Sequence, residues 1–257
     1  MPTAARRPVG RCATVVIEVG IQLHEPAVAL TDLAVGLEAA AFSLGLMRQR
    51  SSRPPPTGRA AESAGWFVVF FASTSVAALA GAALHGLFPS AGASSARRWL
   101  WRISLGSIGV AALSAWCLGT AIALSERSAR RARRLAIVAH GAYLVALLRT
   151  NPPFAVAIAM YVPGSFALAL ALVRRLEDRT IRASAGAALA GIGLTFAAAL
   201  AQLRRIAVHP RLFDHNATYH TIQAIALVCF FRAARGLAQN AGTPKPIAGG
   251  AQIGGRT

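Results

Sequence analysis

The chain has 257 residues, of which 55% are hydrophobic and 14% are charged, and its formal net charge is +18. Apolar stretches of roughly 20 residues recur along it, and each is long enough to cross a bilayer as a helix. The composition therefore favours an integral membrane protein over a soluble domain. The basic residues lie between the apolar stretches, as membrane anchors do, and this spacing excludes nucleic acid as a partner.

The alternation of apolar and polar stretches divides the chain into three parts. Residues 1–13 are polar and basic, and we expect a flexible N-terminal segment there. Residues 14–236 are expected to form an all-α bundle of seven transmembrane helices, and residues 237–257 a disordered C-terminal tail. The predicted spans are 26–47, 65–88, 99–124, 135–148, 154–173, 183–203 and 214–231.

Shorter patterns mark the boundaries of these spans. From Ile17 to His24 apolar and polar residues alternate, which predicts a short strand-like segment at the interface. Pro26 then fits the first turn of the first span. The loop RQRSSRPPPTGR separates the first two spans, and the charge run ERSARRARR separates the third and fourth. Pro163 predicts a kink in the fifth span.

The basic residues are divided unevenly between the two ends of the spans. With the N-terminus outside, seventeen of the 27 Lys and Arg residues lie on the inner side and ten on the outer side. Because inner loops carry the excess of Lys and Arg, we predict that the N-terminus is outside and the C-terminus inside. The Ala- and Arg-rich composition indicates a bacterial chain, and hence the bacterial inner membrane.

Ionisable side chains gather at the outer side of this predicted bundle. With a rise of 1.5 Å per residue, Asp32 and His220 lie about 9 Å below their helix starts, and His85 lies about 5 Å from its helix end. Ionisable groups inside a bilayer are costly and usually line a site or a pathway. One layer therefore contains the candidate site, formed by Glu25, Asp32, His85, Asp214, His215 and His220.

The seventh span begins with the densest polar pattern. Asn216, His220 and Gln223 follow an i, i+4, i+7 spacing, which places them on one helical face. His215 and His220 are five residues apart, roughly 140° around an ideal helix, so both can face one ion only if the helix start is irregular. Asp214 fits the N-cap of this span as well as it fits a residue of the candidate site.

Several polar residues also have an interpretation that involves no site. His85 fits a hydrogen bond within the helix packing, and His24 and Glu25 fit ordinary interfacial positions. Glu38 fits a protonated, hydrogen-bonded acid. His140 lies in the opposite half of the bundle, and we expect it to belong to a different environment.

The histidines and the nearby carboxylates are the residue types that a metal site requires. Zinc binds imidazole nitrogens at about 2.0–2.1 Å, keeps one position open for water, and relies on carboxylates that orient its ligands. His85, His215 and His220 would supply the ligands, with Asp32 or Asp214 nearby. Water bound there would be acidified and could attack an amide or an ester. Haem b held between His85 and His220 is the alternative cofactor.

This pattern resembles the superfamily of seven-helix membrane hydrolases that includes the alkaline ceramidases and the progestin and adiponectin receptors. In that superfamily one zinc histidine lies near the end of the second span and two lie at the start of the seventh. His85, His215 and His220 match in order and side. The chain departs from the pattern in three ways: the last two histidines are one residue further apart than HxxxH, Gly81 replaces a serine, and no aspartate follows in the third span.

A second resemblance covers more of the chain. The segments HEPAVALTDLAVG, ALHGLF and DHNATYHTIQAIAL are similar to an uncharacterised family of bacterial multi-span proteins, over most of residues 24–235. That family implies no activity, so the functional expectation depends on the histidines and carboxylates alone.

Taken together, these patterns predict a metal-dependent membrane hydrolase that acts on a lipid-like amide or ester at the outer leaflet. Asp32 is expected to be the general base or a carboxylate that orients the metal ligands. The alternative is a non-enzymatic transporter, receptor or accessory subunit of a membrane complex. The expected partners are the bilayer and a lipid substrate. The metal ligands would be His85, His215 and His220, held in position by Glu25, Asp214 and Asn216.

Overall fold

The computed structural model describes residues 15–16, 22–51, 58–89 and 94–240. Two short strands, β1 (Val15–Val16) and β2 (Gln22–Leu23), pair in antiparallel fashion before the helices begin. Expectations for residues 1–13, for the strand-like segment at 17–21 and for the tail beyond residue 240 lie outside the described residues. The helices are α1 (Pro26–Ser51), α2 (Gly58–Leu87), α3 (Ser95–Ala123), α4 (Glu126–Arg149), α5 (Phe154–Val173), α6 (Arg182–Leu203) and α7 (His215–Asn240).

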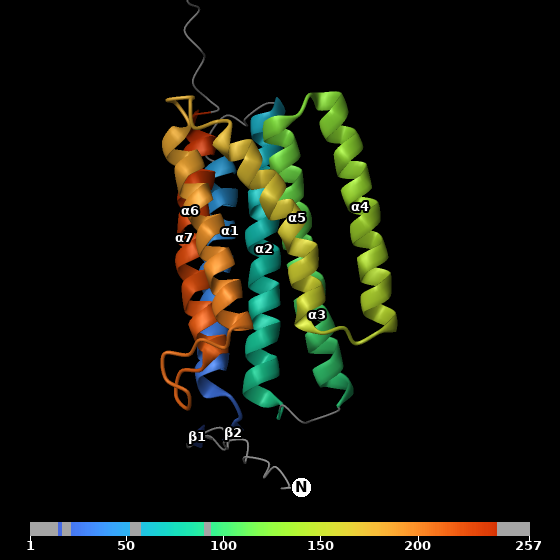
Figure 1. Cartoon of the computed structure of the whole chain (residues 1–257), viewed down its shortest axis with the longest axis vertical. Helices are drawn as coiled ribbons and strands as arrows, with labels where there is room; N and C mark the ends of the chain where they lie inside the picture. The colour runs from blue at the N-terminus through green and yellow to red at the C-terminus, as the bar shows by residue number, and fades with distance from the viewer. Residues whose placement is uncertain (1–14, 17–21, 52–57, 90–93, 241–257) are drawn as a thin grey trace, which may run out of the picture.

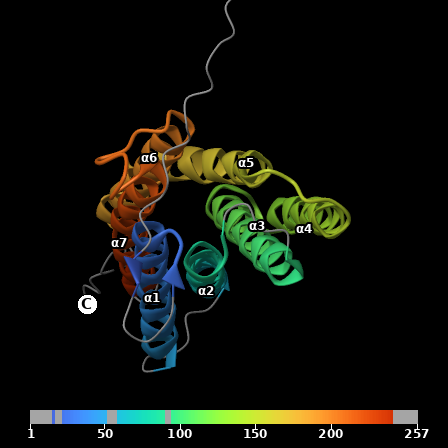
Figure 2. The ribbon, with the colours of Figure 1, turned by 90° about the horizontal axis from the view of Figure 1, so that it is seen from below.

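The described helices confirm the all-α class, and their arrangement is a ring with one helix outside it. Successive helices run in opposite directions, so α1, α3, α5 and α7 begin at the end where α2, α4 and α6 finish (Figure 1). We call this end, drawn at the bottom of Figure 1, the lower end. Contacts close a ring in the order α1, α2, α3, α5, α6, α7 and back to α1. α4 stands outside the ring, beside α3 (Figure 2).

Many large apolar side chains face outward from the bundle. Within the described residues, five helices are long and apolar enough to cross a membrane, namely α1, α2, α3, α5 and α6. Their outward faces present apolar side chains where a soluble protein would place polar ones. These exposed residues include Leu30, Leu37, Leu44, Phe166, Leu170, Leu200 and Leu203.

α7 is less apolar than those five helices because polar residues gather in its first turns. It packs between α1 and α6, and Ala217, Ala226 and Leu227 on it are fully buried. Burial of apolar residues on one side of a helix leaves another side free for polar residues. Its polar lower end can therefore face the interior of the ring.

α4 begins at Glu126, well before the predicted span 135–148. Ser125 caps the helix by accepting a hydrogen bond from the backbone N–H of Ser128 at 3.4 Å. Arginine is a good helix former, so the charge run ERSARRARR is helical and does not form a connection. Arg133 in this run makes an ion pair with Glu62 of α2. The fourth helix is therefore longer than the apolar pattern predicts.

An aromatic cluster fills the ring toward its upper end. Phe42 of α1 stacks on Phe231 of α7 with ring centroids 4.2 Å apart, and Phe71 of α2 meets both rings edge-on. Phe70 and Phe230 extend the cluster, with ring centroids 5.3 Å apart. The tight packing in this half leaves the open space of the bundle to the lower half.

Gly119 allows the close approach of α3 and α5. A Cβ added there would lie 2.8 Å from the backbone nitrogen of Leu168, which cannot move independently of α5. Gly119→Ala should therefore force the two helices apart and destabilise the fold by about 1–3 kcal/mol, which would lower the thermal unfolding midpoint in detergent. Gly141→Ala, where an added Cβ meets nothing within 4 Å, should not lower the midpoint, because alanine is the better helix former. Equal losses in the two variants would contradict this packing argument.

Candidate functional site

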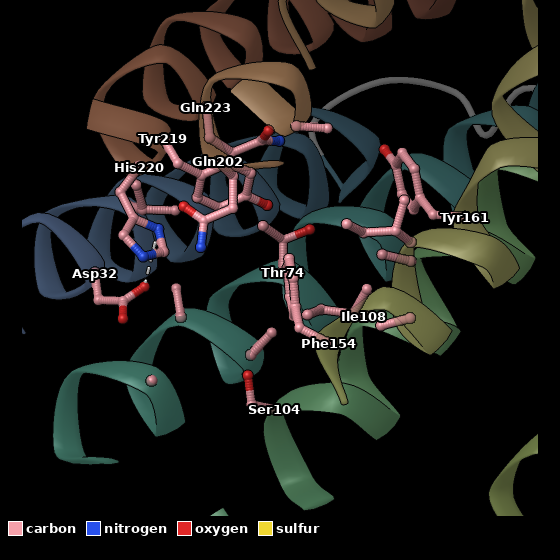
Figure 3. Close-up of a pocket in the computed structure, with 18 of the residues that line it drawn as sticks. Asp32, Thr74, Ser104, Ile108, Phe154, Tyr161, Gln202, Tyr219, His220 and Gln223 are labelled. Atoms are coloured by element: carbon pink, nitrogen blue, oxygen red, sulfur yellow. Dashed lines mark ion pairs between the residues drawn. The ribbon is translucent and has the colours of Figure 1, made fainter. Parts of the chain in front are cut away.

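The lower half of the ring contains a partly open cavity of about 240 Å³. Among the described residues, its wall is formed by all six ring helices and receives nothing from α4. Asp32, Gln202, Tyr219 and His220 gather at one side of the cavity, and Tyr161 lies at the other (Figure 3). Most of the remaining wall is apolar or aromatic and includes Val35, Phe70, Leu84, Ile108, Phe154, Ile158 and Val162.

Asp32 and His220 form a buried pair between α1 and α7. Asp32 is 3% exposed, and its Oδ1 atom lies 3.2 Å from Nδ1 of His220. Because an isolated carboxylate is costly inside a bilayer, the imidazole stabilises Asp32 in this position. The pair can share one proton, so it can accept a proton from a polar group placed beside it or donate one.

Gly81 of α2 provides the space that this carboxylate occupies. A Cβ added to Gly81 would lie 2.5 Å from Oδ2 of Asp32, closer than real Cβ contacts come. The resemblance to the hydrolases expects a serine at position 81. The chain has glycine there, and a larger residue would collide with the Asp32 carboxylate.

A second carboxylate–imidazole pair joins the segment before α1 to the end of α2. Oε2 of Glu25 lies 2.6 Å from Nδ1 of His85, and the backbone N–H of Glu25 donates to the His85 carbonyl at 3.1 Å. The hydrogen bond from His85 lowers the pKa of the Glu25 carboxyl, although burial acts in the opposite direction. His85 thus has a packing partner and also lines the cavity.

Asp214 is the N-cap of α7. Its Oδ1 atom accepts a hydrogen bond from the backbone N–H of Ala217 at 3.0 Å. Its Oδ2 atom accepts one from the side-chain amide of Asn216 at 3.3 Å. Asn216, His220 and Gln223 all line the cavity, as their spacing on one helical face predicts. The cap interpretation of Asp214 is therefore confirmed.

His215 and His220 do not face the same space. α7 is helical from His215 onward, so the five-residue spacing turns the two imidazoles roughly 140° apart. His220 lines the cavity, whereas His215 is not among its lining residues. Within the part of the chain that the structure describes, no group of three or more His, Cys, Asp or Glu side chains is placed to hold a metal ion.

These residues do not fit a catalytic zinc, which takes three protein ligands. The zinc centre of His85, His215 and His220 stays a prediction without geometric support. The two histidines expected to hold haem b, His85 and His220, line one cavity, and haem ligation also stays a prediction. His140 lies outside this cavity, buried on α4 with its ring centroid 5.9 Å from that of Tyr143. The expectation that His140 belongs to a different environment is confirmed, but its expected place in the opposite half is wrong: α4 starts at Glu126, so His140 lies nearer to the lower end of this helix than to its upper end (Figure 1).

Several cavity residues were not singled out from the sequence as site candidates. Trp101 lies near the start of α3, where tryptophans of membrane proteins are common, and it lines the cavity while its Nε1–H donates to the Pro152 carbonyl at 3.0 Å. Gln202, one residue before the end of α6, also lines the cavity. A single amide near the end of an apolar span is the one signal that could have indicated it.

Glu25→Gln should weaken the lower end of the bundle, because it removes a charge-assisted hydrogen bond that contributes about 1.5–3 kcal/mol. His85 lowers the pKa of Glu25 in the folded state, so this stabilisation is present above the ordinary carboxyl range and is lost as the pH falls through the lowered pKa. The gap in unfolding midpoint between wild type and variant should therefore close in acid. Glu177→Gln, at an exposed position after α5, should show no gap at any pH. If the difference in midpoint between the wild type and Glu25→Gln did not change with pH, the stabilisation would not depend on the charge of the Glu25 carboxylate.

Comparisons with known proteins identify a family but no activity. The model of a family of unknown function, DUF6962, matches residues 27–239, a range that includes every residue lining the cavity. No curated protein and no solved structure matches the chain, so the resemblance to the ceramidases and receptors gains no support. The expectation of a family without known activity is confirmed: the chain belongs to the DUF6962 family.

Proposed function

We propose that the protein is a membrane receptor or carrier that binds a small amphipathic molecule in the cavity inside its helix ring. The proposal rests on the division of the cavity wall into an end with ionisable side chains and a largely apolar remainder. Asp32, His85 and His220 lie toward the lower end, and the rest of the wall is largely apolar. A concave, mostly apolar pocket with a few convergent polar groups is the usual form of a small-molecule site.

The size of the cavity limits the ligand. Its volume of about 240 Å³ is below the roughly 300–1,000 Å³ of sites for drug-sized ligands. The proposed ligand therefore has a single short apolar chain, in contrast to a two-chain lipid. Burial of that chain, worth roughly 25 cal/mol per Å², would supply most of the affinity, and the polar end would fix the orientation.

We place the polar end of the cavity at the outer face of the membrane. The proposed topology has seven spans, α4 and α7 included, with the N-terminus outside and the C-terminus inside a bacterial inner membrane. The ligand would then enter from the outer leaflet. The arginines at the upper end support this orientation, because the inner side of a membrane protein is the more basic one; they include Arg48, Arg50, Arg127, Arg130, Arg131, Arg134, Arg174, Arg175, Arg232 and Arg235.

A lipid hydrolase is the second candidate function. The observation that favours it is the pairing of each imidazole with a carboxylate through Nδ1, which is typical of histidines that bind metals or transfer protons. In that function Asp32 would be the general base that activates water for attack on an amide or ester. The binding function ranks first because the described residues offer no set of three metal ligands.

Bromo-octanol, whose bromine quenches nearby tryptophans, tests the binding function. Trp101 lines the cavity, so titration of the wild-type protein in lipid nanodiscs should quench its fluorescence saturably. Trp101→Phe should remove that saturable component. Ala199→Leu should weaken the apparent affinity by about tenfold, because the new side chain fills space that the ligand's apolar chain would occupy.

Ala197→Leu is the matched control for this experiment. Ala197 lies on the same helix, is exposed, and is not among the cavity-lining residues. Its leucine variant should bind as the wild type does. Quenching that never saturates in the wild type, or equal weakening in both leucine variants, would exclude the cavity as the binding site.

Elemental analysis of the purified protein separates the two candidate functions. The binding function requires no bound metal, so the zinc content should be far below one ion per chain and should be the same in His220→Ala. A zinc content close to one ion per chain that falls in both His85→Ala and His220→Ala would favour the hydrolase instead.

A further inference from the structure

A chain of three polar side chains links the start of α7 to the end of α6. The Asn216 side-chain amide donates from Nδ2 to Oδ2 of Asp214 at 3.3 Å. The Gln202 side-chain amide donates from Nε2 to Oδ1 of Asn216 at 2.6 Å. Asn216 and Gln202 both line the cavity, whereas Asp214 lies just outside it as the cap of α7.

The direction of this chain follows from the chemistry of its first member. A carboxylate accepts hydrogen bonds and donates none, and the N-terminus of a helix stabilises negative charge. Asn216 must therefore turn its NH₂ group toward Asp214 and its oxygen toward Gln202. Gln202 must in turn offer its NH₂ group to that oxygen, which leaves the Gln202 Oε1 atom on the other side of the amide.

Two amide oxygens that face the cavity have no partner in the described part of the chain, and the direction of the chain of polar side chains accounts for the one on Gln202. Oε1 of Gln202 is buried and has no hydrogen-bond partner among the described residues, and the same is true of Oε1 of Gln223. Both side chains line the cavity, and Gln223 is 8% exposed. Buried acceptors without a partner are destabilising, and a bound molecule that donates hydrogen bonds would satisfy them.

We infer that the Asp214–Asn216–Gln202 chain makes the polar end of the cavity an acceptor site, which selects amphipathic ligands whose head group donates hydrogen bonds, such as an alcohol or an amine. This inference rests on the proposed binding function and adds the chemical class of the ligand. Asp32 contributes a further acceptor at the same end of the cavity (Figure 3). Of the described residues that line the cavity, none is Lys or Arg, and its two histidines, His85 and His220, are each paired with a carboxylate of the protein. The described wall therefore offers no uncommitted cation for a carboxylate head group.

Octanol and methyl heptyl ether provide the test, because they are isomers that differ in the hydroxyl donor. Isothermal titration of the wild-type protein in nanodiscs, with empty nanodiscs subtracted, should show octanol binding about tenfold tighter than the ether, because only octanol satisfies the free oxygens. Equal affinities would overturn the inference while leaving cavity binding intact. Failure of both isomers to bind would overturn the proposed binding function, and the inference with it.

Asp214→Asn is the variant that tests the chain itself. Asparagine caps a helix about as well as aspartate, but its amide can donate to Asn216, so the two following amides can reverse and Gln202 can present its NH₂ group. The preference for octanol should fall clearly below the roughly tenfold of the wild type, and the part that remains would come from the acceptors of Gln223 and Asp32. Full retention of the preference would overturn the inference.

Two further variants complete the design. Gln202→Met removes the free oxygen outright and should also lower the preference for octanol, so the test remains if Asp214→Asn fails to fold. Asp178→Asn is the matched control, because Asp178 lies in the turn between α5 and α6 at the upper end, and it should keep the wild-type preference. A preference that is unchanged in Gln202→Met would contradict the role of its oxygen.

Discussion

A carboxylate among apolar helices needs a hydrogen-bonding or charged partner. At the lower end of the bundle this requirement determines which helices are connected by polar contacts. Asp32 meets it through His220, which ties the first helix of the ring to the last. Glu25 and His85 form an equivalent pair that ties the entry of α1 to the end of α2. These polar contacts at the lower end and the aromatic cluster toward the upper end hold α1, α2 and α7 together. The cavity lies in the lower half, where polar contacts replace part of the apolar packing and the space between the helices is not filled.

The positions of the helices could be predicted from the sequence wherever apolarity and helicity coincide. The fifth helix runs from Phe154 to Val173, the range that its apolar stretch predicts. The first half of α4 is helical but highly charged, so hydropathy alone gives no sign of it. The ring order is also absent from the sequence pattern. Periodicity shows which face of a helix is apolar, but it does not show that α5 packs against α3 while α4 remains outside.

Part of the site could also be predicted from the sequence, because helical periodicity shows which residues of one helix share a face. Helical spacing placed Asn216, His220 and Gln223 on one face, and all three line the cavity. The same geometry turns His215 away, because a helix that is regular from its first residue cannot bring positions five apart to one point. Gln202 could not be found in this way, since its importance depends on a hydrogen bond to Asn216 across two helices.

The contact between Gly81 and Asp32 also restricts how the two positions can vary among relatives. A Cβ at position 81 would meet the Asp32 carboxylate at 2.5 Å, so a larger residue at 81 requires this carboxylate to leave its present position or a smaller residue at 32. The joint presence of glycine and aspartate is therefore a sequence marker. It would divide the members of the family into those that retain the buried acid and those that have lost it, before any of their structures is known.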